Sequence, residues 1–380
     1  MNVVVLRELQ PGEARVALMP ESVRKLVALK AMLQVESGAG LGAARTDQDY
    51  KDAGAQVSSD RTALLEAADV LAVVNRPSAS DFEHLKVGAV VVGFLRPLDE
   101  PAALEPALHR NLTSFAVELI PRITRAQAMD ALSSMATVVG YKAVLLGAAE
   151  IPRMFPLLMT AAGTVPPARV LVLGAGVAGL QAIATARRLG AVVEAYDVRA
   201  AAGEQVLSLG ATFLKVDLGG IKTEDAGGYA VELSEEAMNR GRDLIAEHAR
   251  TADVVITAAQ VPGKRAPMLL TETAVRGMKR GSVIIDLAAS TGGNCALTEP
   301  DKNVEKDGVT IMAPLNLAAT VPVHSSQLYS RNLTAFLSLL IKDGELQIDM
   351  QDNVVGPSCV THQGQVVNQR MAALLAAPVS

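Results

Sequence analysis

The chain has 380 residues, which is long for one hydrophobic core and suggests two domains. Half of its residues are hydrophobic, only 3% are aromatic and none is Trp, so we expect an interior of Ala, Val and Leu, typical of parallel sheets covered by helices. The net charge of −5, with Lys and Arg dispersed along the chain, argues against a nucleic-acid partner.

The N-terminal stretch of the chain predicts an α/β unit. A short apolar run at 3–6 begins it, and a turn and a helix capped near Ser22 follow. Arg15, in that turn, suits a carboxylate or a phosphate, but an arginine near a turn is more often a structural ion-pair residue, and we slightly favour the structural role. Further strands are expected at 52–57, 69–75, 88–95 and 113–118.

A polar pattern marks the stretch that follows these strands. Arg122 opens it, and Gln127, Asp130 and Ser133 are spaced by three residues, so these three share one side of a helix or of its approach. A solvated helix face explains the pattern as well as a polar side that faces a cleft between domains. The pattern alone does not decide between them.

Residues 169–197 read as strand, tight turn, helix and strand. Gly174 permits a sharp turn, Gly176 lets a pyrophosphate approach the backbone, and Gly179 lets the helix pack close to the strand. The N-terminus of the helix offers N–H groups to phosphates. Glycines also make ordinary turns, but with the flanking strands and a terminal acid they favour a dinucleotide site.

The terminal acid is Asp197, which closes the second strand. Its carboxylate can accept hydrogen bonds from the ribose diol of an adenosine and would repel a 2′-phosphate, which favours NAD(H) over NADP(H). Arg199, two residues later, would instead suit a phosphate.

Beyond Asp197, the carboxyl ends of further strands are where a ligand is expected to bind. Strands predicted at 253–259 and 282–288 direct attention to 258–261 and 287–294, where the glycines of TGGN would let the backbone approach a nicotinamide. A charged, glycine-containing loop over 219–229 has little to bury. Two interpretations of Tyr229 in this loop stay open: it closes over a ligand, or it is an ordinary surface tyrosine.

The C-terminal stretch is expected to return to the first domain. A helix through 327–341 and strands at 347–350 and 358–361 would complete that domain. Apolar runs such as 87–95 are about half the length of a membrane span, and the N-terminus lacks the pattern of a signal peptide, so we expect no transmembrane span and a cytoplasmic location. The cysteines, Cys295 and Cys359, are expected to be reduced thiols with no metal site.

Taken together, these stretches resemble domain I of proton-translocating nicotinamide nucleotide transhydrogenase, in its separate alpha-1 subunit form. The resemblance covers nearly the whole chain. Its most specific pieces are RELQPGEARVALMPE, PRITRAQAMDALSS, MTAAGTVPPARVLVLGAGVAGLQAIATARRLGA, DVRAA, AGGYA and GSVIIDLA followed by GGNC.

The resemblance implies that the chain is one component of an enzyme with several subunits. The family's component binds NAD(H) and passes hydride from NADH to NADP+, with NADP(H) bound by a partner subunit, and couples this transfer to proton movement through a membrane part. It also implies a homodimer, membrane-spanning alpha-2 and beta partner subunits, and a peripheral place on the cytoplasmic face of the inner membrane.

The resemblance also implies a fold and a domain division. We expect two Rossmann-like α/β domains with parallel sheets, joined by long helices across a cleft. The first domain would hold residues 1–125 and 325–380, and the NAD(H)-binding domain would hold 126–324 with the linking helix.

The family's functional residues carry over by motif match. The expected catalytic residues are Arg122, Asp130 and Ser133, which would position the nicotinamide end, and Gln127, which would reach toward the partner's nucleotide. Tyr229 would sit on the closing loop. The full set of expected cofactor-binding positions is Arg122, Gln127, Asp130, Ser133, Gly174, Gly176, Val177, Gly179, Asp197, Val198, Arg199, Gly228, Tyr229, Ala258, Gln260 and Leu287.

Two alternatives remain. Alanine dehydrogenase is the nearest relative in fold and shares Arg15, but Asn75 and Arg96 stand where that family carries a lysine and a histidine, and Ser290 stands where it carries an aspartate. Oxidising an amine needs a group that takes a proton, whereas hydride passing between two nicotinamides needs none. Ser290 also replaces an acidic residue of the transhydrogenase pattern. The other alternative is a nucleotide-sensing regulatory module without hydride transfer.

Overall fold

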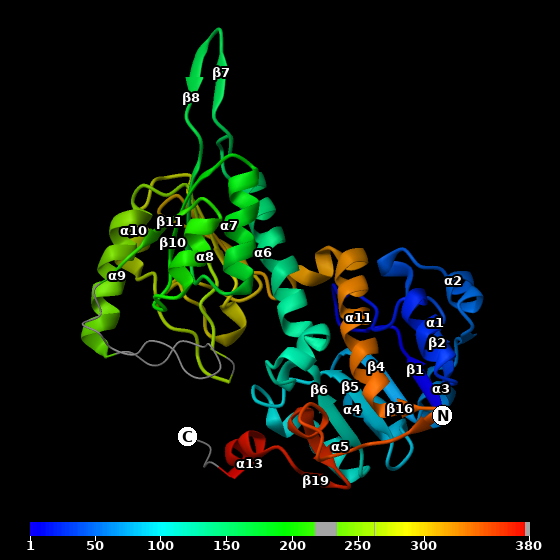
Figure 1. Cartoon of the computed structure of the whole chain (residues 1–380). Helices are drawn as coiled ribbons and strands as arrows, with labels where there is room; N and C mark the ends of the chain where they lie inside the picture. The colour runs from blue at the N-terminus through cyan, green and yellow to red at the C-terminus, as the bar shows by residue number, and fades with distance from the viewer. Residues whose placement is uncertain (217–233, 262, 377–380) are drawn as a thin grey trace. The chain divides into compact units, whose positions relative to one another are not determined.

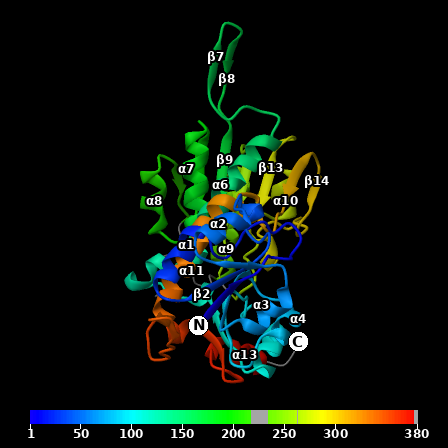
Figure 2. The same ribbon diagram turned by 90° about the vertical axis from the view of Figure 1, so that its right-hand side faces the viewer.

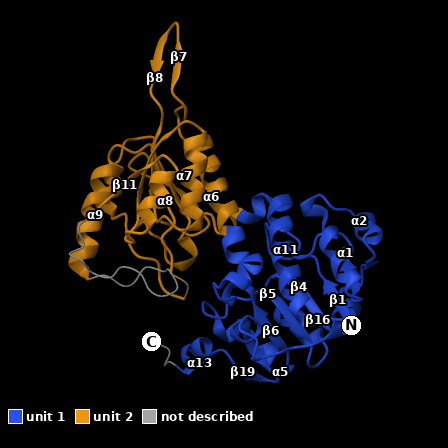
Figure 3. Cartoon of the chain, in the orientation of Figure 1, with its two compact units in different colours: residues 1–135, 318–380 blue, residues 136–317 orange. Residues whose placement is uncertain are grey.

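A computed structural model of the chain describes residues 1–216, 234–261 and 263–376 (Figure 1). The chain forms two compact units, one of residues 1–135 and 318–380 and the other of residues 136–317 (Figure 3). The α/β class with two Rossmann-like domains is confirmed, because each unit is built on a sheet that is mainly parallel. The expected division after residues 125 and 324 stays a prediction.

The first unit contains an eight-stranded sheet. β1 pairs in parallel with both β2 and β4, so the strand order reverses there, as in doubly wound folds. Two antiparallel strands extend the edge beyond β6. Across the sheet the strands are β19 (Gln365–Val366), β18 (Cys359–His362), β6 (Thr113–Ala116), β5 (Val90–Phe94), β4 (Val70–Asn75), β1 (Asn2–Val5), β2 (Met32–Glu36) and β3 (Gln56–Ser58).

The second unit repeats this plan in a seven-stranded sheet. β9 pairs in parallel with β10 on one side and with β12 on the other, so it is the point of reversal. Among the described strands of this sheet, only the edge strand β14 runs antiparallel to the rest. Across the sheet the strands are β11 (Thr212–Leu214), β10 (Val192–Tyr196), β9 (Arg169–Leu173), β12 (Val254–Thr257), β13 (Val283–Asp286), β15 (Val309–Met312) and β14 (Asn303–Lys306).

Alternate residues of these strands enter two separate cores, one on each face of the second sheet. Val170 and Val172 of β9 belong to one core, and Leu171 and Leu173 belong to the other. Because successive side chains of a strand point to opposite faces, a strand buried on both faces reads as a continuous apolar run. This burial explains why the apolar runs in the sequence identify the strands.

Helices connect the strands of both sheets. In the first unit they are α1 (Pro20–Ala28), α2 (Asp47–Asp52), α3 (Arg61–Ala67), α4 (Ala79–His84), α5 (Glu105–His109), α11 (Pro322–Leu340), α12 (Val355–Ser358) and α13 (Gln369–Ala376). In the second they are α7 (Val177–Arg188), α8 (Ala202–Ser208), α9 (Glu235–Ala249) and α10 (Glu272–Arg276), and the division between the units falls within α6 (Ala131–Glu150).

Two local predictions are wrong. The first helix is not capped at Ser22 but begins at Pro20, because proline's fixed φ and missing N–H suit the first position of a helix. Ser22 is buried, and its hydroxyl donates to the carbonyl of Ser330 (3.3 Å). The segment 347–350 is irregular and not a strand, because the carboxylate of Asp349 accepts from the backbone N–H of Gln351 (2.9 Å) and holds a local turn.

α6 is long and apolar enough to cross a membrane by length and composition, with a mean hydropathy of 1.4. It does not stand out as an apolar run in the sequence, because polar residues such as Lys142 interrupt it. Ala143 and Val144 of this helix are fully buried in the core of the second unit. A Cβ on Gly147 would lie 2.9 Å from the side chain of Val254. The core helix of a folded domain passes the same test of length and composition.

A β-hairpin projects away from the sheet of the second unit (Figures 1 and 2). It consists of β7 (Leu158–Thr160) and β8 (Gly163–Val165), and every residue of both strands is exposed. Met159 is 75% exposed although it is apolar.

Candidate functional site

The turn between β9 and α7 lies at the reversal point of the second sheet. Gly174 has φ +98°, a left-handed conformation that L side chains rarely adopt. A Cβ on it would lie 2.9 Å from the backbone nitrogen of Ala259, so the chain packs against the next strand end at this point. Gly179 is equally constrained, because its Cβ would overlap the carbonyl oxygen of Gly174. Both glycines are therefore required by the protein's own packing.

Gly176 is different, because a Cβ on it would meet no protein atom within 4 Å. Its φ of −77° is also open to any residue. The fold itself does not explain this glycine, whereas the close approach of a phosphate to the backbone would explain it.

The same turn exposes the N-terminus of α7. Gly176 is the N-cap residue and makes no side-chain cap to the first N–H groups of this helix of 12 residues. Val177, the first helical residue, is 40% exposed. Such a helix start carries partial positive charge and suits an anion.

Asp197 follows β10 and is 9% exposed. One carboxylate oxygen accepts from the backbone N–H of Ala175 (2.7 Å), so the acid also holds the glycine-rich turn in place. Arg199 folds back and pairs with the same carboxylate (Nη2–Oδ2 2.8 Å). Between them, half-buried Val198 packs on the core.

The strand ends next to this turn bring three other predicted positions together. The N–H of Ala258 donates to the carbonyl of Leu173 at the end of β9 (2.7 Å). The side-chain amide of Gln260 donates to the carbonyl of Leu287 (3.2 Å). Ala258, Gln260 and Leu287 therefore lie at the carboxyl edge of the second sheet, where ligands of this fold bind.

In the first unit, the predicted polar positions lie at the start of α6 and on its approach. Gln127 lies on a 3-10 helix, η4 (Thr124–Met129), and Ser133 lies in the first turn of α6. Asp130 stands between the two helices, and its carboxylate accepts from the N–H (2.8 Å) and the hydroxyl (2.6 Å) of Ser133. Arg122 and Gln127 are exposed.

Sequence reasoning missed the anchors of this segment. The side chain of Arg125 contacts Asp352 (2.7 Å), and the amide of Asn332 on α11 donates to the carbonyl of Ala128 (2.8 Å). Both partners come from the C-terminal stretch of the chain, so no local pattern announces them. Gly228, Tyr229 and the predicted loop at 219–229 lie outside the described residues.

Comparison with known proteins gives the family. Residues 4–139 match alanine dehydrogenase/PNT, N-terminal domain, and residues 143–369 match alanine dehydrogenase/PNT, C-terminal domain. Over 376 residues the chain is 48% identical to an NAD(P) transhydrogenase subunit alpha chain of Rhodospirillum rubrum, and the match covers 97% of this chain and 98% of that protein. The chain belongs to the NAD(P) transhydrogenase alpha-subunit family.

Solved structures agree with this membership. The transhydrogenase from Sinorhizobium meliloti superposes with a TM-score of 0.88 at 45% identity, over 96% of this chain and 100% of that one. An L-alanine dehydrogenase superposes with a TM-score of 0.83 at 25% identity, over 99% of both chains. The resemblance drawn from the sequence motifs is confirmed.

A polar cluster also lies at the reversal point of the first sheet. Arg15 is 6% exposed and pairs with Glu13 (Nη2–Oε2 2.6 Å), so the structural role that we slightly favoured for Arg15 agrees with the geometry. The amide of Asn75 donates to Glu13 (2.9 Å) and to Glu8 (3.2 Å). Burial raises the pKa of the Glu8 carboxyl to about 7, although it accepts from the N–H of Val74 (2.6 Å).

A second buried glutamate serves the neighbouring strand end. Glu118, in the short 3-10 helix η3 (Val117–Leu119), accepts from the N–H groups of Leu95 (3.0 Å) and Arg96 (2.5 Å). Burial raises the pKa of Glu118 to about 7. Arg96 has φ +53° and its side chain pairs with Asp99 (3.2 Å), so it lies in a tight turn.

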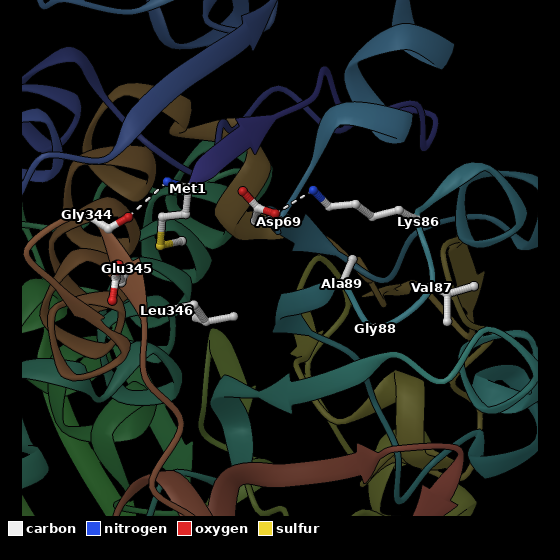
Figure 4. Close-up of a pocket in the computed structure, with 9 residues that line it drawn as sticks. All are labelled: Met1, Asp69, Lys86, Val87, Gly88, Ala89, Gly344, Glu345 and Leu346. Carbon is white, nitrogen blue, oxygen red and sulfur yellow. Dashed lines mark hydrogen bonds and ion pairs between the residues drawn. The ribbon is translucent and has the colours of Figure 1, made fainter.

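A pocket of about 360 Å³ lies at the opposite edge of the first sheet, near the start of β1 (Figure 4). Three of its charged groups already have partners: the Met1 amino group donates to the carbonyl of Gly344 (2.9 Å), and Asp69 pairs with Lys86. Because ligands of doubly wound sheets bind at the carboxyl ends of the strands, we do not consider this pocket a candidate site.

Proposed function

We propose that this chain binds NADH in its second unit and positions it for direct hydride transfer to NADP+ held by a partner chain. Gly176 is the observation that supports this proposal most directly, because its missing side chain serves no contact within the protein. Asp197 at the adjacent strand end suits an adenosine ribose. The relative from Rhodospirillum rubrum is itself named an NAD(P) transhydrogenase subunit.

The residues of the turn would divide the work of binding. The N–H groups at the start of α7 would hold the pyrophosphate, and Asp197 would accept from the ribose diol. The strand ends at Ala258–Gln260 and Leu287 would hold the remaining half. The nicotinamide supplies the hydride when bound, and the protein supplies orientation.

A polar segment of the first unit carries four of the remaining assigned residues. We assign Arg122, Asp130 and Ser133 to positioning the nicotinamide end and Gln127 to the side of the partner's nucleotide, by motif match with the family. Gly228 and Tyr229 are assigned to the closing loop on the same ground. The bond between Asp130 and Ser133 supports this assignment, because it fixes both polar groups in one place.

Hydride transfer between two nicotinamides needs no group that takes a proton. At the reversal point of the first sheet, Asn75 is a neutral amide committed to Glu8 and Glu13. Arg96 is committed to a turn with Asp99. Both arrangements support transhydrogenation over the alternative of an alanine dehydrogenase-like amino-acid dehydrogenase.

Assembly is also included in the proposal. We propose a homodimer that joins membrane-spanning alpha-2 and beta subunits on the cytoplasmic face of the inner membrane and takes part in proton translocation. The exposed apolar hairpin of β7 and β8 supports self-association, because an isolated two-stranded ribbon with an exposed Met159 has little to stabilise it alone.

The test is reconstitution. Purified chain should bind NADH, measured by the change in NADH fluorescence, and should transfer no hydride until a partner chain carrying NADP+ is added. Unaided NAD+-dependent deamination of alanine at a useful rate would contradict the proposal. NADH binding without transfer to any partner would favour the regulatory module.

A further inference from the structure

Asp286 ends β13 and is fully buried, yet both of its carboxylate oxygens are saturated with donors. Burying a carboxylate away from water costs folding free energy unless each of its oxygens accepts hydrogen bonds, and here the surrounding groups supply these bonds. The donors are Thr257 Oγ1 (2.8 Å), Ala288 N (3.0 Å), Asn294 N (2.9 Å), Cys295 N (3.1 Å) and Thr298 Oγ1 (2.6 Å).

The carboxylate holds Asn294, and Asn294 holds the neighbouring strand end. Asn294 is fully buried. Its side-chain oxygen accepts from the N–H of Ala259 (3.1 Å), and its amide donates to the carbonyls of Ala259 (2.9 Å) and Pro267 (2.8 Å). One side chain thus satisfies both polar groups of the peptide backbone at Ala259.

The glycine-rich turn also lies against the peptide bond between Ala258 and Ala259. The Cβ that Gly174 lacks would lie 2.9 Å from the nitrogen of Ala259. Residues 258–260 are therefore clamped between the turn on one side and Asn294 on the other.

The glycines of TGGN have a role in this arrangement. Gly293 has φ +77°, and a Cβ on it would lie 2.8 Å from the carboxylate of Asp286. Only glycine allows the chain to bend around the carboxylate here. Of the two glycines that the sequence placed near a nicotinamide, Gly293 thus serves this buried network, whereas a Cβ on the exposed Gly292 would approach the side chain of Arg265.

From these contacts we infer that Asp286 and Asn294 are positioning residues for nucleotide binding, which act by fixing the loop at Ala258–Gln260. The inference rests on the proposed function. Because β10 and β12 flank β9 on opposite sides, the adenosine half belongs to the side of Asp197 and the nicotinamide half to the side of this loop. The network therefore affects the binding of the nicotinamide half and leaves the adenosine half unaffected.

The decisive variant is Asn294→Asp, which keeps the shape and the acceptor for the N–H of Ala259 but places an oxygen against two carbonyls. We expect the Kd for NADH to rise about tenfold or more, while the Kd for AMP, which lacks the nicotinamide half, changes by less than about twofold. Asn294→Ala removes the clamp without the repulsion and should shift the ratio of the two constants in the same direction.

Thr298→Val is the matched control, because it removes one donor to the same carboxylate and leaves the bonds between the Asn294 side chain and Ala259 in place. It should lower the melting temperature and leave the ratio of NADH to AMP affinity unchanged. The inference is overturned if Asn294→Asp, or Asn294→Ala where the former does not fold, weakens NADH and AMP equally or neither. A wild-type chain that does not bind NADH would instead overturn the proposed function.

Discussion

The guanidinium of Arg199 contacts both carboxylate oxygens of Asp197, with Nε–Oδ1 at 2.9 Å and Nη2–Oδ2 at 2.8 Å. The acid that suits a ribose diol is thus paired with the arginine that suits a phosphate. The same carboxylate also accepts from the N–H of Ala175. Discrimination between NADH and NADPH should therefore be a property of the pair and not of Asp197 alone.

Arg199→Met should sharpen the preference for NADH. Without the guanidinium, the Asp197 carboxylate is uncompensated and repels a 2′-phosphate more strongly. We expect the Kd for NADPH to rise about tenfold and the Kd for NADH to stay within about threefold, measured by nucleotide fluorescence. Asp197→Asn, which keeps an oxygen for Ala175, should shift the ratio the other way. Equal losses for both nucleotides in Arg199→Met would refute this account.

Substitution of the glycines in the turn should separate binding from folding. Gly176→Ala adds a methyl group where no protein atom lies within 4 Å, so the melting temperature should hardly change. The methyl group would obstruct the pyrophosphate, and we expect the NADH affinity to fall at least about tenfold. Gly179→Ala, in contrast, overlaps the carbonyl of Gly174 and should destabilise the fold by several kcal/mol. If Gly176→Ala bound NADH as tightly as the wild type, the turn would not hold the pyrophosphate.

The regions of the molecule that could be predicted from the sequence are those with a local signal. The apolar runs at β9 and β10 and the glycines between them locate the turn within a few residues, because strand burial and tight turns depend on adjacent residues. The capping position assigned to Ser22 fails because Pro20 decides where the helix begins.

The remainder depends on contacts between distant positions. Glu8, Glu13 and Asn75 meet because parallel strands bring their carboxyl ends to one edge, and no motif in the sequence records this meeting. The bonds from Asp286 and Asn294 to neighbouring strand ends are equally invisible before the order of β12 and β13 is known. The only local signal there is the TGGN pattern. Its glycines predicted a close approach to a ligand, whereas in the structure Gly293 lies against the buried carboxylate of Asp286.

The carboxylate of Asp130 caps the start of α6 by accepting from Ser133. Loss of this cap should reduce both the stability of the chain and its activity. Asp130→Ala removes the acceptor for the N–H and hydroxyl of Ser133 and should cost about 1 kcal/mol of folding free energy. If Asp130 and Ser133 position the nicotinamide, hydride transfer in the reconstituted assay should fall at least about tenfold.

Asp60→Ala is the control for this cap, since Asp60 accepts from the N–H of Ala63 (3.0 Å) at the start of α3. It should cost a similar free energy of unfolding in denaturant titration and leave the transfer rate unchanged. Equal rates for the two variants would remove Asp130 from the site.

Glu8 predicts a pH dependence of stability. Its pKa is raised from 4.5 to about 7, so the native state binds the proton more tightly than the unfolded state does. Its contribution is complete below about pH 4.5, declines as the pH rises to about 7 and is then lost. Glu8→Gln cannot ionise, so its free energy of unfolding relative to wild type should increase by on the order of 1 kcal/mol between pH 5 and 8.

Glu118→Gln should give the same sign, because burial raises the pKa of Glu118 to about 7 as well. Urea titrations at several pH values measure both effects. A difference from wild type that is constant with pH, or that decreases as the pH rises, would mean that these carboxyls ionise normally in the folded chain.

The hairpin predicts the site of self-association. Met159 is 75% exposed on β7, and burying such a side chain on a second copy would contribute about 1.5–3 kcal/mol for each protomer. Met159→Lys should therefore weaken the proposed homodimer, and sedimentation velocity at micromolar concentration should show more monomer. Leu207→Lys on α8 is the control, since Leu207 is 56% exposed and lies outside the hairpin. Similar dissociation by both variants, or by neither, would place the interface elsewhere.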